Sequence, residues 1–307
     1  MKEDYNPLVT IGVLTYNSSK YVLETLESAR AQTYKNIELI ISDDCSTDNT
    51  VELCREWVEK NKDRFVRCEI LTVEKNTGIP ANCNRLLRES KGRWFKLIAG
   101  DDILASDCIE SFINFVKGNP EAEIACAKVQ VFEEVFNVQN FKSIIGCSLA
   151  FSFAEARVQH RMLASKNQIK APSVFAKTEL LRSVGGYDES WMAEDYPMWM
   201  KLTRRGTKIY FLDRIVVFYR RGESILLKSE KLFNERYFFN MHEWAKQERY
   251  PYLSVIQRMV YWYFHIVYRA FCGNIFNKST RTRRFFFNFL MGRWGIRSKF
   301  FSLIRSK

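Results

Sequence analysis

The chain has 307 residues, of which 47% are hydrophobic and 27% charged, and this ordinary globular composition excludes a largely disordered protein. The net charge is +12, and the eight cysteines are scattered without a Cys-x-x-Cys pair, which argues against a zinc site and for free thiols in a reducing cytoplasm. The first residues lack the apolar core of a signal peptide, and no run of about 18 uncharged apolar residues predicts a membrane-spanning helix.

The first half of the chain alternates between apolar runs typical of buried strands and stretches with helical spacing. Strands are predicted at residues 8–15, 37–42, 68–73 and 94–98. Each is followed by a predicted helix whose apolar side chains recur on one face, as Val22, Leu26 and Ala29 do. This alternation predicts an α/β fold with a doubly wound, mostly parallel sheet that is flanked by helices.

Polar residues follow the ends of these strands, where ligands bind in open α/β sheets. The fourth strand ends at Gly100 and two adjacent carboxylates, Asp101 and Asp102, which repel each other unless a cation or hydrogen bonds neutralise them. Mg²⁺ and Mn²⁺ prefer oxygen ligands, and Mg²⁺ combines one or two carboxylates with substrate phosphates and water. Taken alone, the same residues are equally typical of a turn with a helix cap.

The second half is less regular. A strand is predicted at 124–132, a short strand at 173–176 and a helix at 196–204, while residues 136–170 show no clear period. Glu194 and Asp195 precede that helix, where acids complement the positive end of the helix dipole. The dipole explains one acid well and two acids less well.

Together these stretches resemble the family 2 glycosyltransferases, which are inverting nucleotide-sugar enzymes with a GT-A fold, over roughly residues 7–225. The order and spacing of the motifs carry the resemblance. The matching motifs are Tyr16-Asn17, Asp43-Asp44-x-Ser46-x-Asp48-x-Thr50, Asn76-x-Gly78 with Asn84, Gly100-Asp101-Asp102, and Gly185-Gly186-Tyr187-Asp188-Glu189 followed by Glu194-Asp195.

The resemblance implies a role for each matched residue. Tyr16 would stack on the nucleotide base and Asp44 would hydrogen-bond it, while Asp101 would ligate Mn²⁺ or Mg²⁺. Asp195 would act as the general base on the acceptor hydroxyl, and Glu194 would orient Asp195 or the acceptor. The remaining nucleotide-binding candidates are Thr15, Asn17, Asp43, Asn76, Gly78, Asn84 and Asp102.

Two departures from the family pattern concern the metal and the diphosphate. Ala99 stands in place of the first acid of a full Asp-x-Asp, so Asp101 must be the principal metal ligand. Where many relatives carry Tyr-Arg-x-His, this chain has residues 219–222 as Tyr-Arg-Arg-Gly, without a His ligand. Arg220 and Arg221 therefore become candidates for contacting the diphosphate, with less weight on the metal.

The resemblance implies a metal-assisted, inverting transfer of a sugar from a nucleotide-diphosphate sugar, with UDP as the expected nucleotide. The acceptor would be a hydroxyl of a glycan or of a lipid-linked glycan in bacterial surface-polysaccharide biosynthesis. The predicted catalytic domain covers residues 1–225, with nucleotide-sugar binding in about 1–120 and the acceptor side in about 121–225. A helical extension that is basic and aromatic follows at 226–307.

Three other functions are compatible with parts of the sequence. A nucleic-acid-binding protein could use the twelve basic and sixteen aromatic residues of 249–307, although no recognisable module signature is present. A nucleotidyltransferase would keep the metal acids but normally needs a glycine-rich phosphate loop or an early basic strand. A non-catalytic sugar-nucleotide binder is suggested only by Ala99 and opposed by Asp101 and Asp195.

The C-terminal part carries the whole excess of positive charge, because no acidic residue follows Glu248. Residues 252–271 have apolar side chains near helical spacing, and residues 281–301 alternate basic clusters with aromatic ones. Such segments lie in a membrane interface or form an aromatic core or a dimer interface. We expect a cytoplasmic protein held peripherally on the anionic inner face of the cell membrane through 250–307, with no nucleic-acid partner. The oligomeric state is left open, with a homodimer among the options.

Overall fold

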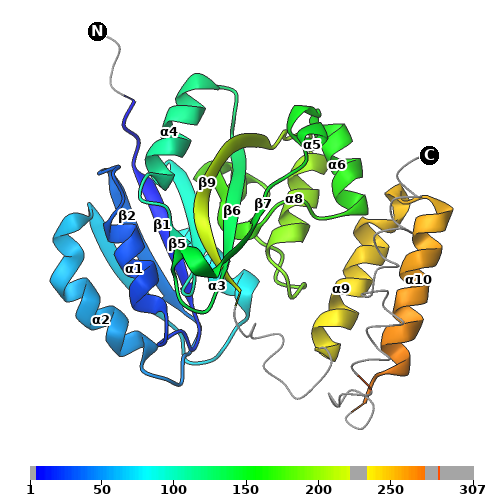
Figure 1. The fold of residues 1–307 in the computed structure, drawn as a ribbon, viewed down its shortest axis with the longest axis horizontal. Coiled ribbons are helices and arrows are strands. Elements are labelled where there is room, and N and C mark those ends of the chain that lie inside the picture. Colours follow the sequence, from blue (N-terminus) through cyan, green and yellow to red (C-terminus); the bar gives the residue numbers. More distant parts are fainter. Residues whose placement is uncertain (1–4, 222–233, 274–282, 284–307) are drawn as a thin grey trace. The chain divides into compact units, whose positions relative to one another are not determined.

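The computed structural model of the chain describes residues 5–221, 234–273 and 283. The chain divides into two compact units, residues 1–222 and residues 223–307. The described part of the first unit is an α/β domain built on one mixed sheet, and that of the second consists mainly of two helices (Figure 1).

The first four strands form the parallel half of the sheet. They are β1 (Val9–Thr15), β2 (Ile37–Asp43), β3 (Arg67–Thr72) and β4 (Trp94–Ala99), and all four predicted strands are confirmed. They lie in the order β3-β2-β1-β4 with parallel neighbours, so their carboxyl ends meet at one edge of the sheet. All of β2 and nearly all of β1 are buried, as expected of parallel strands covered on both faces.

A helix follows each of these strands in the chain. The helices are α1 (Val22–Arg30), α2 (Thr50–Asn61), α3 (Ile79–Glu89) and α4 (Cys108–Gly118). The apolar face predicted for the first of them is confirmed, because Val22, Leu26 and Ala29 are fully buried. Pro80 lies in the first turn of α3, where a missing backbone N–H costs nothing.

The rest of the sheet is mixed. Its strands are β5 (Ile103–Leu104), β6 (Ile124–Glu133), β7 (Phe141–Ile145), β8 (Val174–Lys177) and β9 (Tyr210–Arg221). β8 pairs antiparallel with both β4 and β6, β6 and β9 are parallel, and β5 and β7 join antiparallel to β9 and β6. The predicted fold class is confirmed, and the parallel arrangement is confined to β1–β4 and the β6–β9 pair. Two register shifts against β6 accompany the curvature of β9 that Figure 1 shows.

The stretch without a clear period, 136–170, contains β7 and two short helices, α5 (Leu149–Phe153) and α6 (Ala156–Ser165). After β8 come α7 (Thr178–Ser183) and α8 (Asp195–Arg204). The core between the two halves is aromatic, because Phe175 stacks on both Trp94 and Phe112 with ring centroids 4.9 Å apart.

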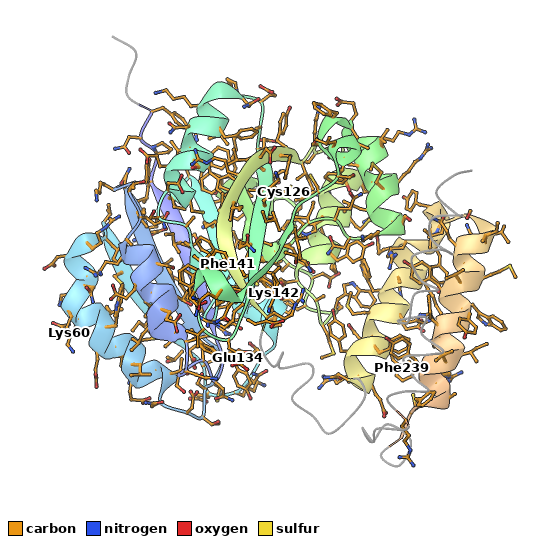
Figure 2. All side chains as sticks on the ribbon, viewed as in Figure 1. Lys60, Cys126, Glu134, Phe141, Lys142 and Phe239 are labelled. Atoms are coloured by element: carbon orange, nitrogen blue, oxygen red, sulfur yellow. The ribbon has the colours of Figure 1, made fainter. Side chains whose placement is uncertain are left out.

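The described part of the second unit pairs α9 (Glu235–Glu248) with α10 (Val255–Ala270). Ser254 and Gln257 form a capping box that begins α10, and the rings of His242 and His265 stack 3.9 Å apart between the helices. Figure 2 shows the aromatic side chains of this pair, including Phe239. Among the described residues, no helix is both long and apolar enough to cross a bilayer. Of the predicted segment 281–301, all but Arg283 lies outside the described residues.

Candidate functional site

The loop after β2 is held by the first carboxylate of its acidic pair. Asp43 is buried, and it accepts hydrogen bonds from Thr15 Oγ1 at 2.8 Å and from Ser46 N at 2.7 Å. The Ser46 hydroxyl also donates to it at 2.5 Å. Thr15 and Asp43 thus join the ends of β1 and β2, and their predicted contact with a nucleotide stays a prediction.

The second carboxylate joins the ends of β2 and β3. Asp44 accepts hydrogen bonds from Thr77 Oγ1 at 2.6 Å, from Gly78 N at 2.8 Å and from Arg85 Nη2 at 2.9 Å. Burial would raise the pKa of Asp44, but these hydrogen bonds outweigh burial and lower the pKa below its ordinary value. Asp44 is therefore ionised at neutral pH. Protein donors contact both of its oxygens, and its predicted bond to a nucleotide base stays a prediction.

The Tyr16-Asn17 turn lies against the same loop. Asn17 adopts a positive φ of 49°, and its side-chain oxygen accepts a hydrogen bond from Thr47 N at 2.8 Å. Tyr16 is half-buried, and Asn76 is exposed. The strand-end polar residues expected from the motifs are thus brought to one edge of the sheet.

The acid pair after β4 has one buried and one exposed member. Asp102 is 2% exposed, and its Oδ1 accepts a hydrogen bond from the backbone N–H of Arg220 at 2.9 Å. Asp101 is exposed at the strand end. Burial raises the pKa of Asp102, and the neighbouring charge of Asp101 raises it further. Although part of Asp101 reaches solvent, the protein atoms packed around its carboxyl displace some of its water and raise its pKa as well.

The side chain of Arg220 is 1% exposed and is engaged inside the protein. Its guanidinium donates to the carbonyl of Asp101 at 2.8 Å, to the carbonyl of Glu134, and to the carboxylate of Glu24 at 2.7 Å. It also lies 4.0 Å from the ring centroid of Tyr21. Figure 2 marks Glu134, at the end of β6. The predicted diphosphate contact of Arg220 stays a prediction, while the next residue, Arg221, is exposed.

A divalent metal at Asp101 would have few protein ligands. Among the described residues, no cluster of three or more His, Cys, Asp or Glu side chains could enclose an ion. Mg²⁺ often takes only one or two protein carboxylates and completes its sphere with phosphates and water. An exposed carboxylate at a strand end therefore fits a metal that arrives with a diphosphate, and does not fit a cage built by the protein alone.

A second acid pair lies at the start of α8. Asp195 accepts a hydrogen bond from Tyr196 N at 2.6 Å and another from Asn167 Nδ2 at 3.1 Å. Burial, and then the charge of Asp195, raises the pKa of Glu194 to about 8. Burial also raises the pKa of Asp195, against the opposing effects of the Tyr196 N–H, Asn167 and Lys170. With its pKa near 8, Glu194 is largely protonated at neutral pH.

Apolar side chains explain the burial of this second pair. Phe95, Leu97, Tyr187 and Trp199 line a small recess together with the two carboxylates. The indole Nε1 of Trp199 is buried, and no partner for it occurs within the described part of the chain. A low-dielectric wall on one side of the carboxylates disfavours their charged forms.

Asn84 connects α3 to the Gly-Gly-Tyr-Asp-Glu loop. Its amide donates to the carbonyl of Tyr187 and to Glu189 Oε1, both at 2.8 Å, and its oxygen accepts from Tyr187 N at 2.8 Å. Gly186 has a φ of +70°, and a Cβ there would meet Asn84 Oδ1 at 2.5 Å, so the loop requires glycine at this position. Asn84 therefore holds the loop that leads to the second acid pair, and its predicted nucleotide contact stays a prediction.

Tyr219 lies near both acid pairs. After burial, the charges of Asp102, Asp101, Asp195 and Glu194 raise the pKa of Tyr219 to about 12. The ammonium of Lys170 lies 5.9 Å from the centre of the Tyr219 ring. The two pairs thus lie close enough to act on one phenol, although they are separated by about ninety residues in the chain.

Comparison with known proteins places this arrangement in a family. The model of "Glycosyl transferase family 2" matches residues 10–178, which is more than half of the chain. The chain belongs to glycosyl transferase family 2. Its predicted family and enzyme class, a glycosyltransferase, are thereby confirmed.

Two curated relatives indicate how far this glycosyltransferase resembles other members. It is 27% identical to the uncharacterized glycosyltransferase RP339 of Rickettsia prowazekii, over 71% of this chain and 65% of the relative, so the chain spans just under two thirds of that relative. It is 28% identical to the UDP-Glc:alpha-D-GlcNAc-diphosphoundecaprenol beta-1,3-glucosyltransferase WfaP of Escherichia coli, over 69% of this chain and 77% of the relative.

Solved structures support the GT-A fold of this glycosyltransferase. S. aureus TarS 1-349 in complex with UDP-GlcNAc matches with a TM-score of 0.60 and 21% identity, over 78% of this chain and 66% of that one. The mannosyltransferase PcManGT of Pyrobaculum calidifontis, in complex with GDP-Man and Mn²⁺, matches with a TM-score of 0.53 and 16% identity, over 94% of this chain and 86% of that one. At these identities the likeness concerns the fold alone.

Three residues of the glycosyltransferase site were not predicted from the sequence. Arg85 braces Asp44, Asn167 contacts Asp195, and Lys170 lies beside Tyr219. Asn167 and Lys170 belong to the stretch without a period, where no local pattern singles out a polar side chain. Arg85 lies one residue after the matched Asn84, and that proximity was the available signal.

Proposed function

We propose that this glycosyltransferase transfers a sugar from a UDP-sugar, with inversion, to a hydroxyl of a glycan or lipid-linked acceptor in surface-polysaccharide biosynthesis. One observation carries the proposal. Two acid pairs from different elements lie on either side of Tyr219: Asp102 accepts a hydrogen bond from the backbone N–H of the next residue, Arg220, and Asp195 is held by Asn167, three residues before the Lys170 that lies 5.9 Å from the Tyr219 ring. The reaction needs one carboxylate on the leaving-group side of the sugar and another on the acceptor side.

Two relatives support the choice of nucleotide and acceptor. WfaP is named for a UDP-glucose donor and a diphosphoundecaprenol-linked acceptor, and a TarS structure holds UDP-GlcNAc. In the proposed donor site Tyr16, half-buried after β1, stacks on the base. Thr15, Asn17, Asp43, Asn76, Gly78 and Asn84 complete that site by contact or by holding its loops.

Asp101 is proposed to hold Mn²⁺ or Mg²⁺ together with the donor diphosphate, as its exposed carboxylate at the end of β4 allows. PcManGT, which shares the fold, was solved with GDP-Man and Mn²⁺. The chemistry that such an ion supplies is neutralisation of the charge on the leaving diphosphate. Asp102 keeps the strand end in place through Arg220 N, and Arg221 is the exposed cation proposed for the diphosphate.

Asp195 is proposed as the general base. A base must be unprotonated, and Glu194, whose pKa is about 8, keeps its proton at neutral pH. The N–H groups of Asn167 and Tyr196 fix the carboxylate of Asp195, and a protonated Glu194 can donate a hydrogen bond to the acceptor. With one base on the face opposite the leaving group, the displacement is in line and inverts the anomeric centre.

We also propose that the enzyme meets its acceptor at the inner face of the cell membrane, through residues 250–307, and that residues 1–225 and 226–307 serve as its catalytic domain and its extension. The eleven basic residues of 250–307, without a single acidic one, support this location. Residues 274–282 and 284–307 lie outside the described residues, so the support from the structure concerns α10 alone.

The direct test is incubation of the full chain with a panel of UDP-, GDP- and dTDP-sugars, a lipid-linked acceptor, and Mn²⁺ or Mg²⁺. We expect transfer from a UDP-sugar and, by NMR of the product, inversion of the donor's anomeric configuration. Retention of configuration would contradict the single-base mechanism. Binding of the donors without turnover of any would leave the non-catalytic sugar-nucleotide binder as the correct function.

A further inference from the structure

Helix α10 exposes a run of large apolar side chains. The exposed fractions are 70% for Val255, 59% for Ile256, 63% for Met259, 65% for Trp262 and 43% for Ile266. At about 100° per residue these five side chains share an arc of about 120° on the helix surface. We call this set the α10 apolar face.

The side of α10 that faces α9 already has its packing partners. Val267 is 5% exposed and packs with Phe238 of α9 and with Phe264 and Phe271. The ring of Tyr268 stacks on that of Phe238 with centroids 3.7 Å apart. The α10 apolar face is therefore additional to the surface that holds the two helices together, and an exposed contiguous apolar patch indicates a binding surface.

Positive charge borders the α10 apolar face. Arg258 and Arg269 are exposed, and their helical positions fall beside that of Trp262. Helix α10 contains no Asp or Glu, and no acidic residue follows Glu248 in the chain. This arrangement fits the surface of an anionic lipid bilayer. The apolar side chains can enter the boundary between headgroups and acyl chains, while the arginines stay at the lipid phosphates.

We propose that the α10 apolar face docks on an anionic lipid bilayer, with α10 lying in the plane of the interface. The inference builds on the proposed peripheral membrane association but does not depend on glycosyl transfer. The alternative partner for this face is a second copy of the chain. A two-fold contact through this face would bring Arg258 and Arg269 of both copies together without an acid on the helix to neutralise them, which disfavours the dimer.

Sedimentation of the full chain with vesicles of phosphatidylcholine alone, or mixed with phosphatidylglycerol, tests this docking surface. We expect binding to the mixed vesicles that weakens as salt is added. The double substitution Met259→Glu, Trp262→Glu should lower the partition coefficient by roughly tenfold or more, because two apolar side chains leave the interface. Arg258→Gln and Arg269→Gln should each lower it by about fivefold, and only on anionic vesicles.

Phe153→Glu is the matched control, since Phe153 is an aromatic residue of α5 that is 81% exposed, and its partition should equal that of the wild type. Wild-type partition of the Met259→Glu, Trp262→Glu variant would overturn the proposal. So would a wild-type dimer that this variant converts to monomers while vesicle binding is absent. Hydrolysis of UDP-sugars in vesicle-free buffer, measured on the same variants, reports on the catalytic proposal separately.

Discussion

The side-chain amide of Asn167 donates a hydrogen bond to Asp195 Oδ2 at 3.1 Å, and its own oxygen accepts one from Ile169 N at 3.1 Å. The second bond fixes which way the amide points, so the N–H₂ group must face Asp195. A group that donates to a carboxylate favours its charged form. Asn167 therefore holds the proposed base in position and keeps its pKa lower than burial alone would set it.

Replacing Asn167 with Ala should lower kcat by about tenfold and move the acid limb of the kcat–pH profile to higher pH, because Asp195 then binds its proton more tightly. The measurement is initial rate against pH with saturating donor. Gln168→Ala is the control, since Gln168 accepts from Ser148 and no contact with Asp195 is observed for it. An unshifted profile in Asn167→Ala would show that Asn167 does not act through Asp195.

Asp195→Asn should lower kcat by about 10²–10⁴ while the dissociation constant of the donor stays unchanged, because only the transition state uses the base. Stopped-time product assays and donor titration by calorimetry separate the two quantities. Asp188→Asn, in the preceding turn, should keep wild-type turnover, since its carboxylate accepts from Ser190 N and has no observed contact with Asp195 in the described part of the chain. Equal turnover of wild type and Asp195→Asn would remove the proposed mechanism.

Asp101→Asn should weaken binding of Mn²⁺ and of the donor together, because a charged oxygen ligand is replaced by a neutral amide. Titration of the donor with and without Mn²⁺ checks this, and the gain in donor affinity that Mn²⁺ gives the wild type should disappear in the variant. Asp107→Asn, whose carboxylate pairs with Arg214 at 2.6 Å, should retain that gain. A full Mn²⁺ effect in Asp101→Asn would place the ion elsewhere.

Glu194→Gln should make the protein more stable, and increasingly so as pH rises. The folded pKa of Glu194 is raised from 4.5 to about 8, so between these values the folded state must keep a proton that the unfolded chain releases. This penalty is absent below pH 4.5 and grows by at most about 1.4 kcal/mol per pH unit up to about pH 8. Thermal unfolding of both proteins at pH 5 and pH 8 measures it. An equal Tm difference at the two pH values would show that Glu194 is not held protonated.

Variants of the neighbouring Arg220 and Arg221 should have different effects, because the first arginine is structural and the second is proposed to bind the donor. Arg220→Met should cost about 2–4 kcal/mol of unfolding free energy, because it leaves two carbonyls and Glu24 without their cation. Arg221→Ala should leave the unfolding free energy unchanged and raise KM for the donor. Urea unfolding and donor kinetics check both. If Arg220→Met unfolds with the wild-type free energy, Arg220 has no structural role and becomes a candidate for contacting the donor diphosphate.

Local pattern in the sequence determined the parallel half of the sheet and the polar residues that follow it. Strand and helix periods are local properties, and strands with parallel neighbours necessarily bring their ends to one edge. That is why Tyr16, Asp44 and Asp101 could be named as candidates from the sequence alone. The second acid pair was found in the same way, because Glu194 and Asp195 stand directly before a helix.

Only the tertiary structure decided what the remaining side chains contact. Nothing local shows that Arg220 contacts Glu24, almost two hundred residues earlier, or that Asn167 meets Asp195. The sequence also did not show that β8 pairs antiparallel with β4 and β6, because the alternation of side chains in a four-residue strand is the same in either direction. These contacts join residues far apart in the chain, and their partners are chosen by packing of the whole domain, which periodicity does not encode.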